Sequence, residues 1–510
     1  MVTEPAATLE VSCNYIGGRW VPGRSEEVLR VFSPITGEAV VLIPTGTPAD
    51  ALAAVQAARV ALAPWQALTV EHRGELVRAA FDRLAAATAE LAELQHVEMG
   101  QPVDLAVSSL TGSLAEVPSY TTDAASKQEE RLAHGRVVRR GRGVAALIVP
   151  WNFPLPVALD GLAPLLLTGN CVVWKPSERS PLSAIRAMDL LSDVLPPGVV
   201  NLLLGDARAG QPLVDADIDL VVFTGSVATG RKIGESTGRR LIKAVLELGG
   251  KDPVIIDADV DPQWAARQVL DGAFQNSGQL CTSMERIYVH HAVAHQFITS
   301  LVEQTRHLHP GPLVDQRQRA IVAAQVEDAV ARGARVVVGG DPPEGGSYYP
   351  PTVLVDVPDD ANLMREETFG PIAPVTVVSS FDEALQRANE TMYGLGATVF
   401  TRNEDHVGQA SAVLQAALIW INEWKATSPG WTAEPKRSSG LGAGWGPGLI
   451  QEVTSSTYVH EGSTPPSAPA RRDQVPSRPS QPMIPAHPTS PPRTDRRQTE
   501  TESRAPTSKS

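Results

Sequence analysis

Helix-like patterns of apolar residues dominate the first hundred positions. Ile16 to Trp20, with two glycines at its centre, predicts a hairpin before them. Thr47-Pro48-Ala49-Asp50 combines an N-cap residue, a proline at the first helical position and an acid at the third. We therefore predict a helix that begins after Thr47 and ends at Pro64, and a second helical region from Glu71 to Gly100.

From Gly143 onward the pattern changes to short apolar runs separated by Gly, Pro and helical segments. The runs of the first group cover residues 144–149, 171–174, 199–204, 220–223 and 254–256. A second group follows at residues 286–289, 335–338, 353–357, 372–378, 397–400 and 418–422. Continuous apolar strands that alternate with helices indicate parallel sheets buried on both faces, so the predicted fold class is α/β and doubly wound.

Two strand-like segments have no helix beside them in the sequence. Residues 125–142 alternate charged and small side chains, and residues 452–460 are rich in β-branched side chains. These segments could pair with each other in a small third unit. The last segment, residues 462–510, contains 11 prolines and 8 serines but no Phe, Trp or Tyr. Such a composition cannot bury enough apolar surface to offset the entropy of ordering, so we predict a disordered tail.

Charge and composition exclude several classes of protein. The 57 acidic residues outnumber the 44 Lys and Arg, which argues against binding to nucleic acid or to an anionic membrane surface. Residues 143–174 are apolar and long enough to span a bilayer, but four prolines favour buried strands and a short helix instead. Three cysteines supply no disulfide framework, and the N-terminus lacks a signal-peptide pattern. We therefore expect a cytoplasmic location.

Two candidate ligand-binding segments follow strands of the first group. Pro150-Trp-Asn-Phe-Pro154 places the Asn152 amide at the carboxyl end of a strand, where α/β proteins bind ligands, although an Asn in a loop is usually a turn former. Trp174-Lys-Pro-Ser-Glu178 places Lys175 and Glu178 at a similar position, where they could contact a ribose or a phosphate. A surface ion pair explains these two residues equally well.

Three more segments carry candidate chemistry. Phe223-Thr-Gly-Ser-Val-Ala-Thr-Gly230 leads from a strand into a helix, where backbone N–H groups can approach a pyrophosphate. Leu246-Glu-Leu-Gly-Gly-Lys251 and Asn276-Ser-Gly-Gln-Leu-Cys-Thr282 supply a carboxylate and a thiol that could act as general base and nucleophile. Taken alone, a solitary Cys is more often a small core residue.

In this order and spacing, the five segments resemble the NAD(P)-dependent aldehyde dehydrogenase superfamily. Glu367-Thr-Phe-Gly-Pro371 matches a sixth element of that superfamily. The resemblance implies a Rossmann-like cofactor-binding domain, an α/β catalytic domain and a small β oligomerisation element. We assign the cofactor-binding domain to residues 1–124 and 143–252, the catalytic domain to 253–445 and the oligomerisation element to 125–142 and 446–461.

The resemblance also implies a role for individual residues. Cys281 would be the nucleophile, Glu247 the base that activates water, and Asn152 a donor to the oxyanion together with the backbone N–H of Cys281. No metal is implied. The residues that the resemblance assigns to the cofactor are Trp151, Lys175, Glu178, Gly225, Ser226, Glu367 and Phe369.

The resemblance also indicates the product and the cofactor, but not the aldehyde. Glu247 favours a free carboxylic acid as product, because branches that release acyl-coenzyme A typically lack a Glu there. Glu178 favours NAD over NADP, since an anion repels a 2′-phosphate. A coenzyme A-acylating enzyme and a catalytically silent binding protein of the same fold stay open as alternatives, and the aldehyde is not identified. Relatives form dimers or tetramers, so we expect a homo-oligomer.

Two segments depart from the superfamily pattern. Residues 431–440 retain only a basic residue and the Ser-Gly of a loop that lines the substrate entrance in relatives. The connection around residues 307–314 is about ten residues shorter than usual, judged against typical loop lengths. Shortening there would either trim a surface excursion or change the packing beneath Cys281.

Overall fold

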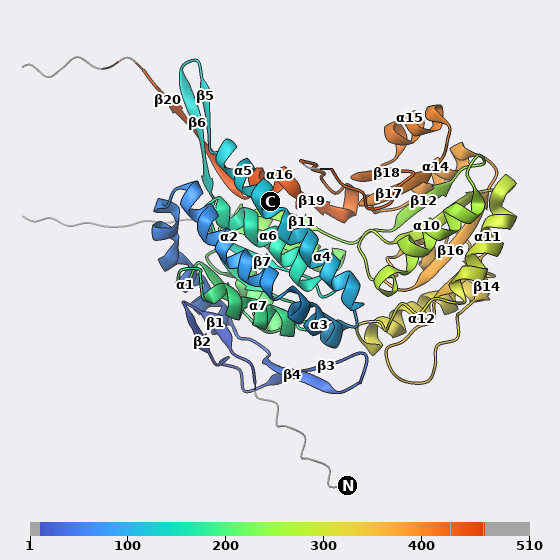
Figure 1. The fold of residues 1–510 in the computed structure, drawn as a ribbon, viewed down its shortest axis with the longest axis horizontal. Helices are drawn as coiled ribbons and strands as arrows, with labels where there is room; N and C mark the ends of the chain where they lie inside the picture. Colours follow the sequence, from blue (N-terminus) through green and yellow to red (C-terminus); the bar gives the residue numbers. More distant parts are fainter. Residues whose placement is uncertain (1–10, 429, 463, 465–510) are drawn as a thin grey trace, which may run out of the picture. The chain divides into compact units, whose positions relative to one another are not determined.

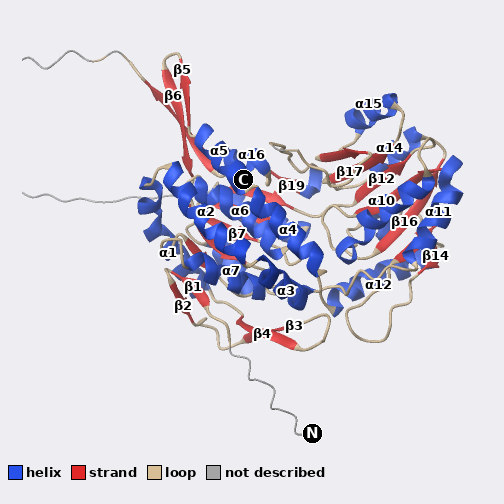
Figure 2. Ribbon diagram, viewed as in Figure 1, coloured by secondary structure: helices blue, strands red, loops and turns tan. Residues whose placement is uncertain are grey.

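A computed structural model describes residues 11–428, 430–462 and 464 (Figures 1 and 2). The predicted disordered tail, residues 462–510, lies almost entirely outside this part of the chain. Two large sheets with helices packed against them make up most of the described residues, and a three-stranded sheet and a hairpin complete the structure. The predicted α/β fold class is confirmed.

The first sheet has eight strands in the order β19-β11-β10-β7-β8-β9-β1-β2. Its central pairs, from β11 to β9, are parallel, and antiparallel strands flank them on both sides. The strands are β1 (Asn14–Ile16), β2 (Arg19–Val21), β7 (Val144–Ile148), β8 (Cys171–Lys175), β9 (Val200–Leu202), β10 (Leu220–Thr224), β11 (Lys243–Glu247) and β19 (Gly440–Leu441).

Helices from the first half of the chain pack around this sheet. Both α1 and α6 contact β8, and their apolar side chains share one core with the strands. The helices are α1 (Pro48–Ala67), α2 (Val70–Ala86), α3 (Thr88–Met99), α4 (Val103–Ala115), α5 (Val117–Ser126), α6 (Pro154–Leu167), α7 (Leu182–Ser192), α8 (Ala207–Asp215) and α9 (Val227–Arg240).

The second sheet has seven strands in the order β14-β15-β16-β13-β12-β17-β18, all parallel except β14. Its strands are β12 (Asp252–Ile256), β13 (Met284–His290), β14 (Arg335–Val338), β15 (Thr352–Val355), β16 (Ile372–Val378), β17 (Gly396–Phe400) and β18 (Leu418–Ile421). Its helical elements are α10 (Pro262–Phe274), η1 (Gln275–Gly278), α11 (His291–Thr305), α12 (Gln316–Ala331), α13 (Asn362–Arg365), α14 (Phe381–Asn389), α15 (Glu404–Val413) and η2 (Arg437–Ser439). Two apolar clusters form its core.

A three-stranded antiparallel sheet joins the two segments that have no helix beside them in the sequence. Its strands are β5 (Glu129–Leu132), β6 (Gly135–Gly141) and β20 (Thr454–His460), and β6 lies in the middle. The predicted pairing is confirmed. Helix α16 (Gly446–Glu452) leads into β20, and β3 (Val28–Phe32) pairs with β4 (Ala39–Pro44) as a separate hairpin.

Three expectations from the first hundred residues are confirmed, among them the second helical region, which contains α2 and α3, and one is wrong. Gly17 and Gly18, both at positive φ, turn β1 into β2, and the Thr47 side chain accepts the Asp50 N–H at 3.2 Å. Helix α1, however, continues through Pro64 to Ala67. Proline leaves the carbonyl four residues earlier without its N–H partner. That residue, Val60, is 80% exposed, so water can take the place of the lost donor.

The apolar pattern groups residues 254–256 with the first sheet, and this grouping is wrong, although the domain boundary assigned after residue 252 already separates them from it. These residues lie within β12, between β13 and β17 in the second sheet, and β11 takes the neighbouring position in the first. The strand β11 starts with Lys243 and ends with Glu247, so its three apolar residues make too short a run to stand out. Residues 248–251 then carry the chain from the first sheet to the second.

Candidate active site

The segment before Cys281 is a strained turn that neighbouring loops hold in place. After α10 the chain passes through Asn276 and Ser277 with positive φ, which costs about 1 kcal/mol or more for each residue without compensating contacts. The Ser277 hydroxyl donates to the carbonyls of Pro310 and Gly311 at 3.0 and 2.9 Å. The shortened connection thus packs directly against the turn that presents Cys281.

Asn152 lies against the same turn. It follows β7, is 6% exposed, and its Nδ2 donates to the carbonyl of Gln279 at 2.9 Å. The Asn276 side chain returns a hydrogen bond to the backbone carbonyl of Asn152 at 3.3 Å. Asn276 and Asn152 are 124 residues apart in the sequence. These two contacts nevertheless fix the Asn152 amide beside Gln279, which lies two residues before Cys281.

Glu247 stands at the carboxyl end of β11, and its side chain is buried. Its Oε1 accepts the Gly444 N–H at 2.8 Å. Burial raises the pKa of Glu247 to about 8, and hydrogen bonds from the Gly444 backbone and the Trp445 side chain act in the opposite direction. A carboxyl group with such a pKa exists in both protonation states near neutral pH, as a general base requires.

Gly249 and Gly250 allow Glu367 and the backbone of Cys281 to come close to the segment after Glu247. A Cβ atom on Gly249 would collide with the Glu367 carboxylate, and a Cβ atom on Gly250 would collide with the backbone carbonyl of Cys281. The Gly250 N–H donates to Glu367 Oε1 at 3.1 Å. The double glycine after Glu247 is therefore required for the close approach of Cys281 and Glu367.

Cys281 is a free, partly exposed cysteine in a negatively charged environment. Desolvation is the main cause that raises the pKa of the thiol to about 12, and the carboxyl groups of Asp252, Glu367 and Glu247 raise it further. The Lys425 ammonium lowers this pKa. At neutral pH the resting thiol is therefore protonated. A base close by has to take its proton before the sulfur can act as a nucleophile.

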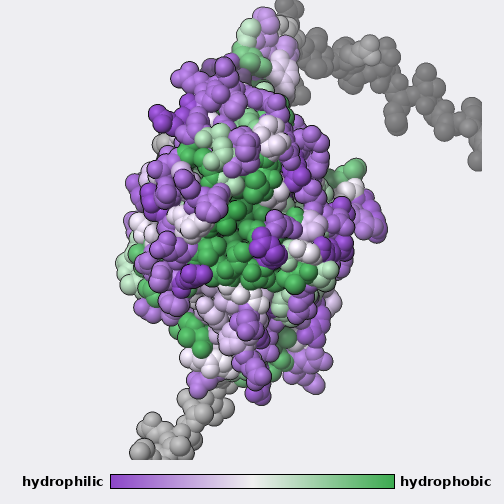
Figure 3. All heavy atoms as spheres, turned by 90° about the vertical axis from the view of Figure 1, so that its right-hand side faces the viewer, coloured by the Kyte–Doolittle hydropathy of each residue, from purple (hydrophilic) through white to green (hydrophobic). Residues whose placement is uncertain are grey.

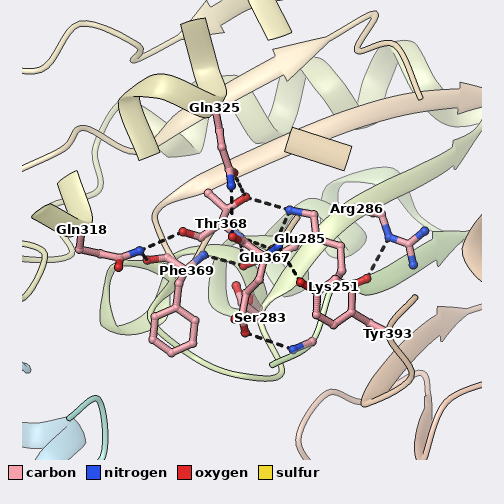
Figure 4. Close-up of polar contacts among 12 residues, drawn as sticks. Lys251, Ser283, Glu285, Arg286, Gln318, Gln325, Glu367, Thr368, Phe369 and Tyr393 are labelled. Carbon is pink, nitrogen blue, oxygen red and sulfur yellow. Dashed lines mark hydrogen bonds and ion pairs between the residues drawn. The ribbon is translucent and has the colours of Figure 1, made fainter. Parts of the chain in front are cut away.

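A buried ion pair holds the segment that contains Glu367 and Phe369 (Figure 4). Lys251 Nζ contacts Glu285 Oε2 at 2.7 Å and also donates to the Thr368 hydroxyl at 2.8 Å. The Glu285 carboxylate accepts the backbone N–H groups of Thr368 and Phe369 at 2.8–3.1 Å. These contacts fix the loop after α13 through both its backbone and a side chain.

Two glutamines of α12 complete this anchor from the other side. Gln318 Nε2 donates to the carbonyls of Thr368 and Phe369, both at 3.1 Å, and Gln325 Nε2 donates to the carbonyl of Glu367 at 3.2 Å. Phe369 has a positive φ of 53°, a conformation that costs energy for an aromatic residue. The network stabilises this conformation and directs the Phe369 ring toward Trp151.

Trp151 and Phe369 face each other across the site. Their ring centroids are 5.3 Å apart in an edge-to-face arrangement, and the Arg179 guanidinium lies 5.6 Å from the centroid of the Trp151 ring. Arg179 also pairs with Asp315 at 3.2 Å. The first and second sheets therefore meet here through aromatic contacts and an ion pair.

The other predicted cofactor residues lie at the carboxyl edge of the first sheet. Lys175 ends β8 and is buried, and its ammonium donates to the Pro176 carbonyl at 3.0 Å. Desolvation lowers the pKa of Lys175, opposed by the charges of Glu178 and Asp206. No ion pair joins Lys175 to Glu178 within the described ranges. The alternative of a surface ion pair is therefore wrong.

Gly225 and Ser226 follow β10, which β7 separates from β8 in the first sheet. Ser226 is the N-cap of α9 and accepts the Thr229 N–H at 3.3 Å, so the first turn of this helix opens toward the edge where Lys175 lies. The N–H groups of a helix N-terminus are well suited to an anion such as a phosphate. A Cβ atom on Gly225 would approach the Phe223 ring to 2.5 Å, so this position requires glycine.

Comparison with known proteins identifies the family. The model of the aldehyde dehydrogenase family matches residues 20–459. This chain belongs to the aldehyde dehydrogenase family. Among its relatives, the betaine aldehyde dehydrogenase of Bacillus subtilis is 31% identical over 481 residues, which cover 88% of this chain and 97% of that protein.

Solved structures of aldehyde dehydrogenases share the fold. The lactaldehyde dehydrogenase of Escherichia coli is 32% identical with a TM-score of 0.85, covering 88% of this chain and 99% of that one. The betaine aldehyde dehydrogenase of Staphylococcus aureus, solved in complex with NAD+, is 29% identical with a TM-score of 0.86, covering 90% of this chain and 96% of that one.

The aldehyde dehydrogenase fold brings most of the predicted site residues together. Cys281, Asn152 and Glu247 surround one turn, Trp151, Glu367 and Phe369 lie beside it, and Lys175, Glu178, Gly225 and Ser226 lie along the edge of the first sheet. Their roles in catalysis and cofactor binding stay predictions. Within the described residues, no helix is both long and apolar enough to cross a membrane, and no group of three or more His, Cys, Asp or Glu could hold a metal ion.

Sequence reasoning missed several residues of the site. Lys251 was read only as the end of a motif, and Glu285 was not considered, although their ion pair anchors the Glu367 segment. Arg179, beside Trp151, and Lys425, near Cys281, were also missed. A buried Lys and a buried Glu that lie 34 positions apart give no periodic signal, so only the fold reveals their contact.

Proposed function

We propose that the protein oxidises an aldehyde to its carboxylic acid with NAD, through a thioester on Cys281. The observation that carries this proposal is the arrangement of Asn152 and Glu247 around the turn of Cys281. A nucleophile, an oxyanion donor and a base with a raised pKa are the groups that acyl transfer requires. Family membership and the NAD+ complex of the Staphylococcus aureus relative support the same reaction class.

In the proposed reaction, Glu247 first takes the proton of the Cys281 thiol. The thiolate then attacks the aldehyde carbon to give a tetrahedral thiohemiacetal. The negative oxygen of this intermediate accepts hydrogen bonds from the Asn152 amide and the backbone N–H of Cys281. Removal of one such donor typically slows a reaction by about 100- to 1,000-fold.

In the second half of the reaction, Glu247 is the base for hydrolysis of the thioester. NAD, when bound, supplies the acceptor for the hydride that leaves the thiohemiacetal carbon, and a thioester on Cys281 results. After the thiol proton has passed from Glu247 to solvent, the Glu247 carboxylate takes a proton from a water molecule, and the resulting hydroxide attacks the thioester carbonyl. The acid leaves, and the Cys281 sulfur is protonated again. The pKa of about 8 suits Glu247 to this role, because it can accept and release a proton near neutral pH.

The residues at the edge of the first sheet fit a dinucleotide. The first turn of α9 offers backbone N–H groups to a pyrophosphate. The buried Lys175 ammonium, which among the described residues bonds only to a carbonyl, can donate to a ribose hydroxyl or phosphate. Glu178 would accept hydrogen bonds from ribose hydroxyls and would repel a 2′-phosphate, which supports NAD over NADP. Glu367, Phe369 and Trp151 would contact the nicotinamide half.

Two alternatives lead to different products. A coenzyme A-acylating enzyme would transfer the acyl group from Cys281 to a thiol, and the buried base Glu247 argues against it. A catalytically silent protein would have no need for the positive-φ turn and the double glycine that bring Cys281, Asn152 and Glu367 together. An NADH assay with and without coenzyme A distinguishes both alternatives from the proposed function.

We also propose that the enzyme is a cytoplasmic homodimer or homotetramer. All three cysteines are free, which suits a reducing compartment. The strand β5 is exposed along its whole length, and Leu132 and Tyr458 of the three-stranded sheet are 47 and 56% exposed. Figure 3 shows apolar side chains gathered in the middle of another face, with polar ones around them. Exposed areas of this kind are typical of interaction surfaces.

The test is an NADH assay with purified protein, NAD and a panel of aliphatic and aromatic aldehydes, with and without coenzyme A. We expect NADH without coenzyme A and a free acid as product. Absence of NADH with every aldehyde would contradict the enzyme assignment. Strict dependence on coenzyme A, with a thioester of coenzyme A as product, would support the acylating alternative.

A further inference from the structure

Lys425 places a positive charge beside the proposed nucleophile. Lys425 lies in the loop after β18 and has a positive φ of 66°. Its ammonium donates to Gln275 Oε1 at 3.1 Å. The same ammonium lies 5.3 Å from the centroid of the Phe153 ring and 5.2 Å from that of Trp424. Two aromatic faces and one amide oxygen therefore surround it.

All three neighbours of Lys425 are linked to the proposed catalytic turn. Phe153 follows Asn152 in the chain, Gln275 begins the turn that leads to Cys281, and the Trp424 indole donates to the carbonyl of Thr282 at 3.3 Å. Lys425 is also the cation that acts on the Cys281 thiol. Its ammonium thus lies beside the turn that carries the proposed nucleophile.

The charge of Lys425 has no acidic partner in the part of the chain that the structure describes. Its hydrogen-bond acceptor, Gln275, is neutral, and the acids of the same loop, Glu423 and Glu434, are exposed and form no ion pair with it. Asp252, Glu247 and Glu367 face the thiol, but burial raises the pKa of each of them to about 8. An anion in this space would therefore find a cation that is not already neutralised.

The same arrangement disfavours a cationic substrate. Aromatic faces bind quaternary ammonium groups through cation–π contacts, but here the ammonium of the chain itself occupies the faces of Phe153 and Trp424. Asp160, seven positions beyond Phe153, is the one acid of α6. Burial raises the pKa of Asp160 to about 7, so it is only partly charged at neutral pH.

We propose that the substrate is an aldehyde that also carries a carboxylate, and that the Lys425 ammonium binds this carboxylate. The inference rests on the proposed aldehyde oxidation and names its substrate class. The carboxylate would replace Gln275 as the acceptor of the Lys425 ammonium. Such a contact discriminates by charge and not by size, so it separates substrates that are otherwise equal in shape.

Two matched pairs of aldehydes test the charge preference. 4-Oxobutanoate is compared with the neutral 4-methylpentanal, and betaine aldehyde with the neutral 3,3-dimethylbutanal, by kcat/KM in the NADH assay. We expect 4-oxobutanoate to exceed 4-methylpentanal by roughly two- to fivefold, as one exposed charge pair provides. We expect betaine aldehyde to fall below 3,3-dimethylbutanal.

Variants assign the preference to Lys425. Lys425→Gln should abolish the advantage of 4-oxobutanoate, and Lys425→Arg should retain it. Arg78→Gln, which removes one positive charge from an exposed position of α2, should leave the ratio unchanged. The ratio of the two substrates also cancels any effect of Lys425 on the Cys281 thiol, because both aldehydes react with the same sulfur.

The outcomes separate the two proposals. If no aldehyde yields NADH, the proposed function fails. If the neutral aldehydes are oxidised but 4-oxobutanoate has no advantage, or keeps its advantage in Lys425→Gln, the assignment of the substrate class is overturned while the proposed function stands. A preference of the wild-type enzyme for betaine aldehyde over 3,3-dimethylbutanal would likewise overturn it.

Discussion

At the scale of single residues, Cys281 differs from the other two cysteines in its surroundings and not in its exposure alone. Cys171 is fully buried in β8, where burial raises the pKa of its thiol to about 12, and Cys13 is partly exposed like Cys281. Only Cys281 has the Asn152 amide and the Glu247 carboxyl group beside its turn. The motif around Cys281 allowed this assignment from the sequence, whereas its electrostatic environment required the fold.

We expect Cys281→Ala to abolish NADH formation, because no other described cysteine lies near a base and an oxyanion donor. The matched control is Cys13→Ala, which removes a thiol of similar exposure. This control should keep wild-type activity in the same assay. Full activity of Cys281→Ala would rule out a thioester mechanism.

The protonation state of Glu247 should set the pH dependence of the steady state. Because burial raises its pKa to about 8, the carboxylate that activates water becomes more abundant as the pH rises through this value. We expect kcat to increase from about pH 6 to about pH 9 and then to level off. In Glu247→Gln this rise should disappear, together with most of the steady turnover. A kcat that falls over this range in the wild-type enzyme would contradict Glu247 as the base.

At the scale of elements, the structure explains how distant segments form one site. The carboxyl ends of β8, β10 and β11 lie at one edge of the first sheet, and residues 248–251 then lead into β12 of the second. Apolar patterns predicted most of these strands. They could not predict which sheet residues 254–256 join, because strand order depends on tertiary packing.

The ion pair between Lys251 and Glu285 should stabilise the element that carries Glu367 and Phe369. Glu285→Gln leaves the Lys251 ammonium buried without its counter-ion, and the loss of a buried partner typically costs about 3–5 kcal/mol. We expect a lower free energy of unfolding in urea and a higher KM for NAD.

The control for this prediction is Glu303→Gln, which removes an exposed carboxylate of α11. Its free energy of unfolding should stay within about 0.5 kcal/mol of the wild-type value. A Glu285→Gln variant with unchanged stability and unchanged KM for NAD would show that the ion pair does not hold this loop.

At the scale of the whole molecule, the sequence already predicted an α/β protein with a small extra β unit. The pairing of β6 with β20, which lie more than 300 residues apart, followed from two strand-like segments that lacked helices. The continuation of α1 beyond Pro64 did not follow from the sequence, because it depends on the exposure of Val60. The anchor around Glu367 was not predictable either, since its members come from four separate segments.

Cofactor binding should stabilise the whole chain. A ligand that binds only the folded state at 100 times its Kd adds about 2.7 kcal/mol to the free energy of unfolding. We expect NAD to raise the Tm, and NADP at the same concentration to raise it less, because Glu178 repels the 2′-phosphate. In Glu178→Gln the two cofactors should differ less. A larger shift with NADP than with NAD in the wild-type protein would contradict the proposed preference.

The central claim is that Cys281 carries the acyl group, and mass spectrometry of the Glu247→Gln variant tests it most directly. This variant lacks the base for both steps, so it should form the thioester more slowly than the wild type, with hydroxide from solvent taking the thiol proton, and should hydrolyse it more slowly still. After incubation with NAD and 4-methylpentanal, we predict one acyl group per chain, located by peptide mapping on Cys281. A chain without an acyl group after NADH has formed, or an acyl group on another residue, would contradict the account.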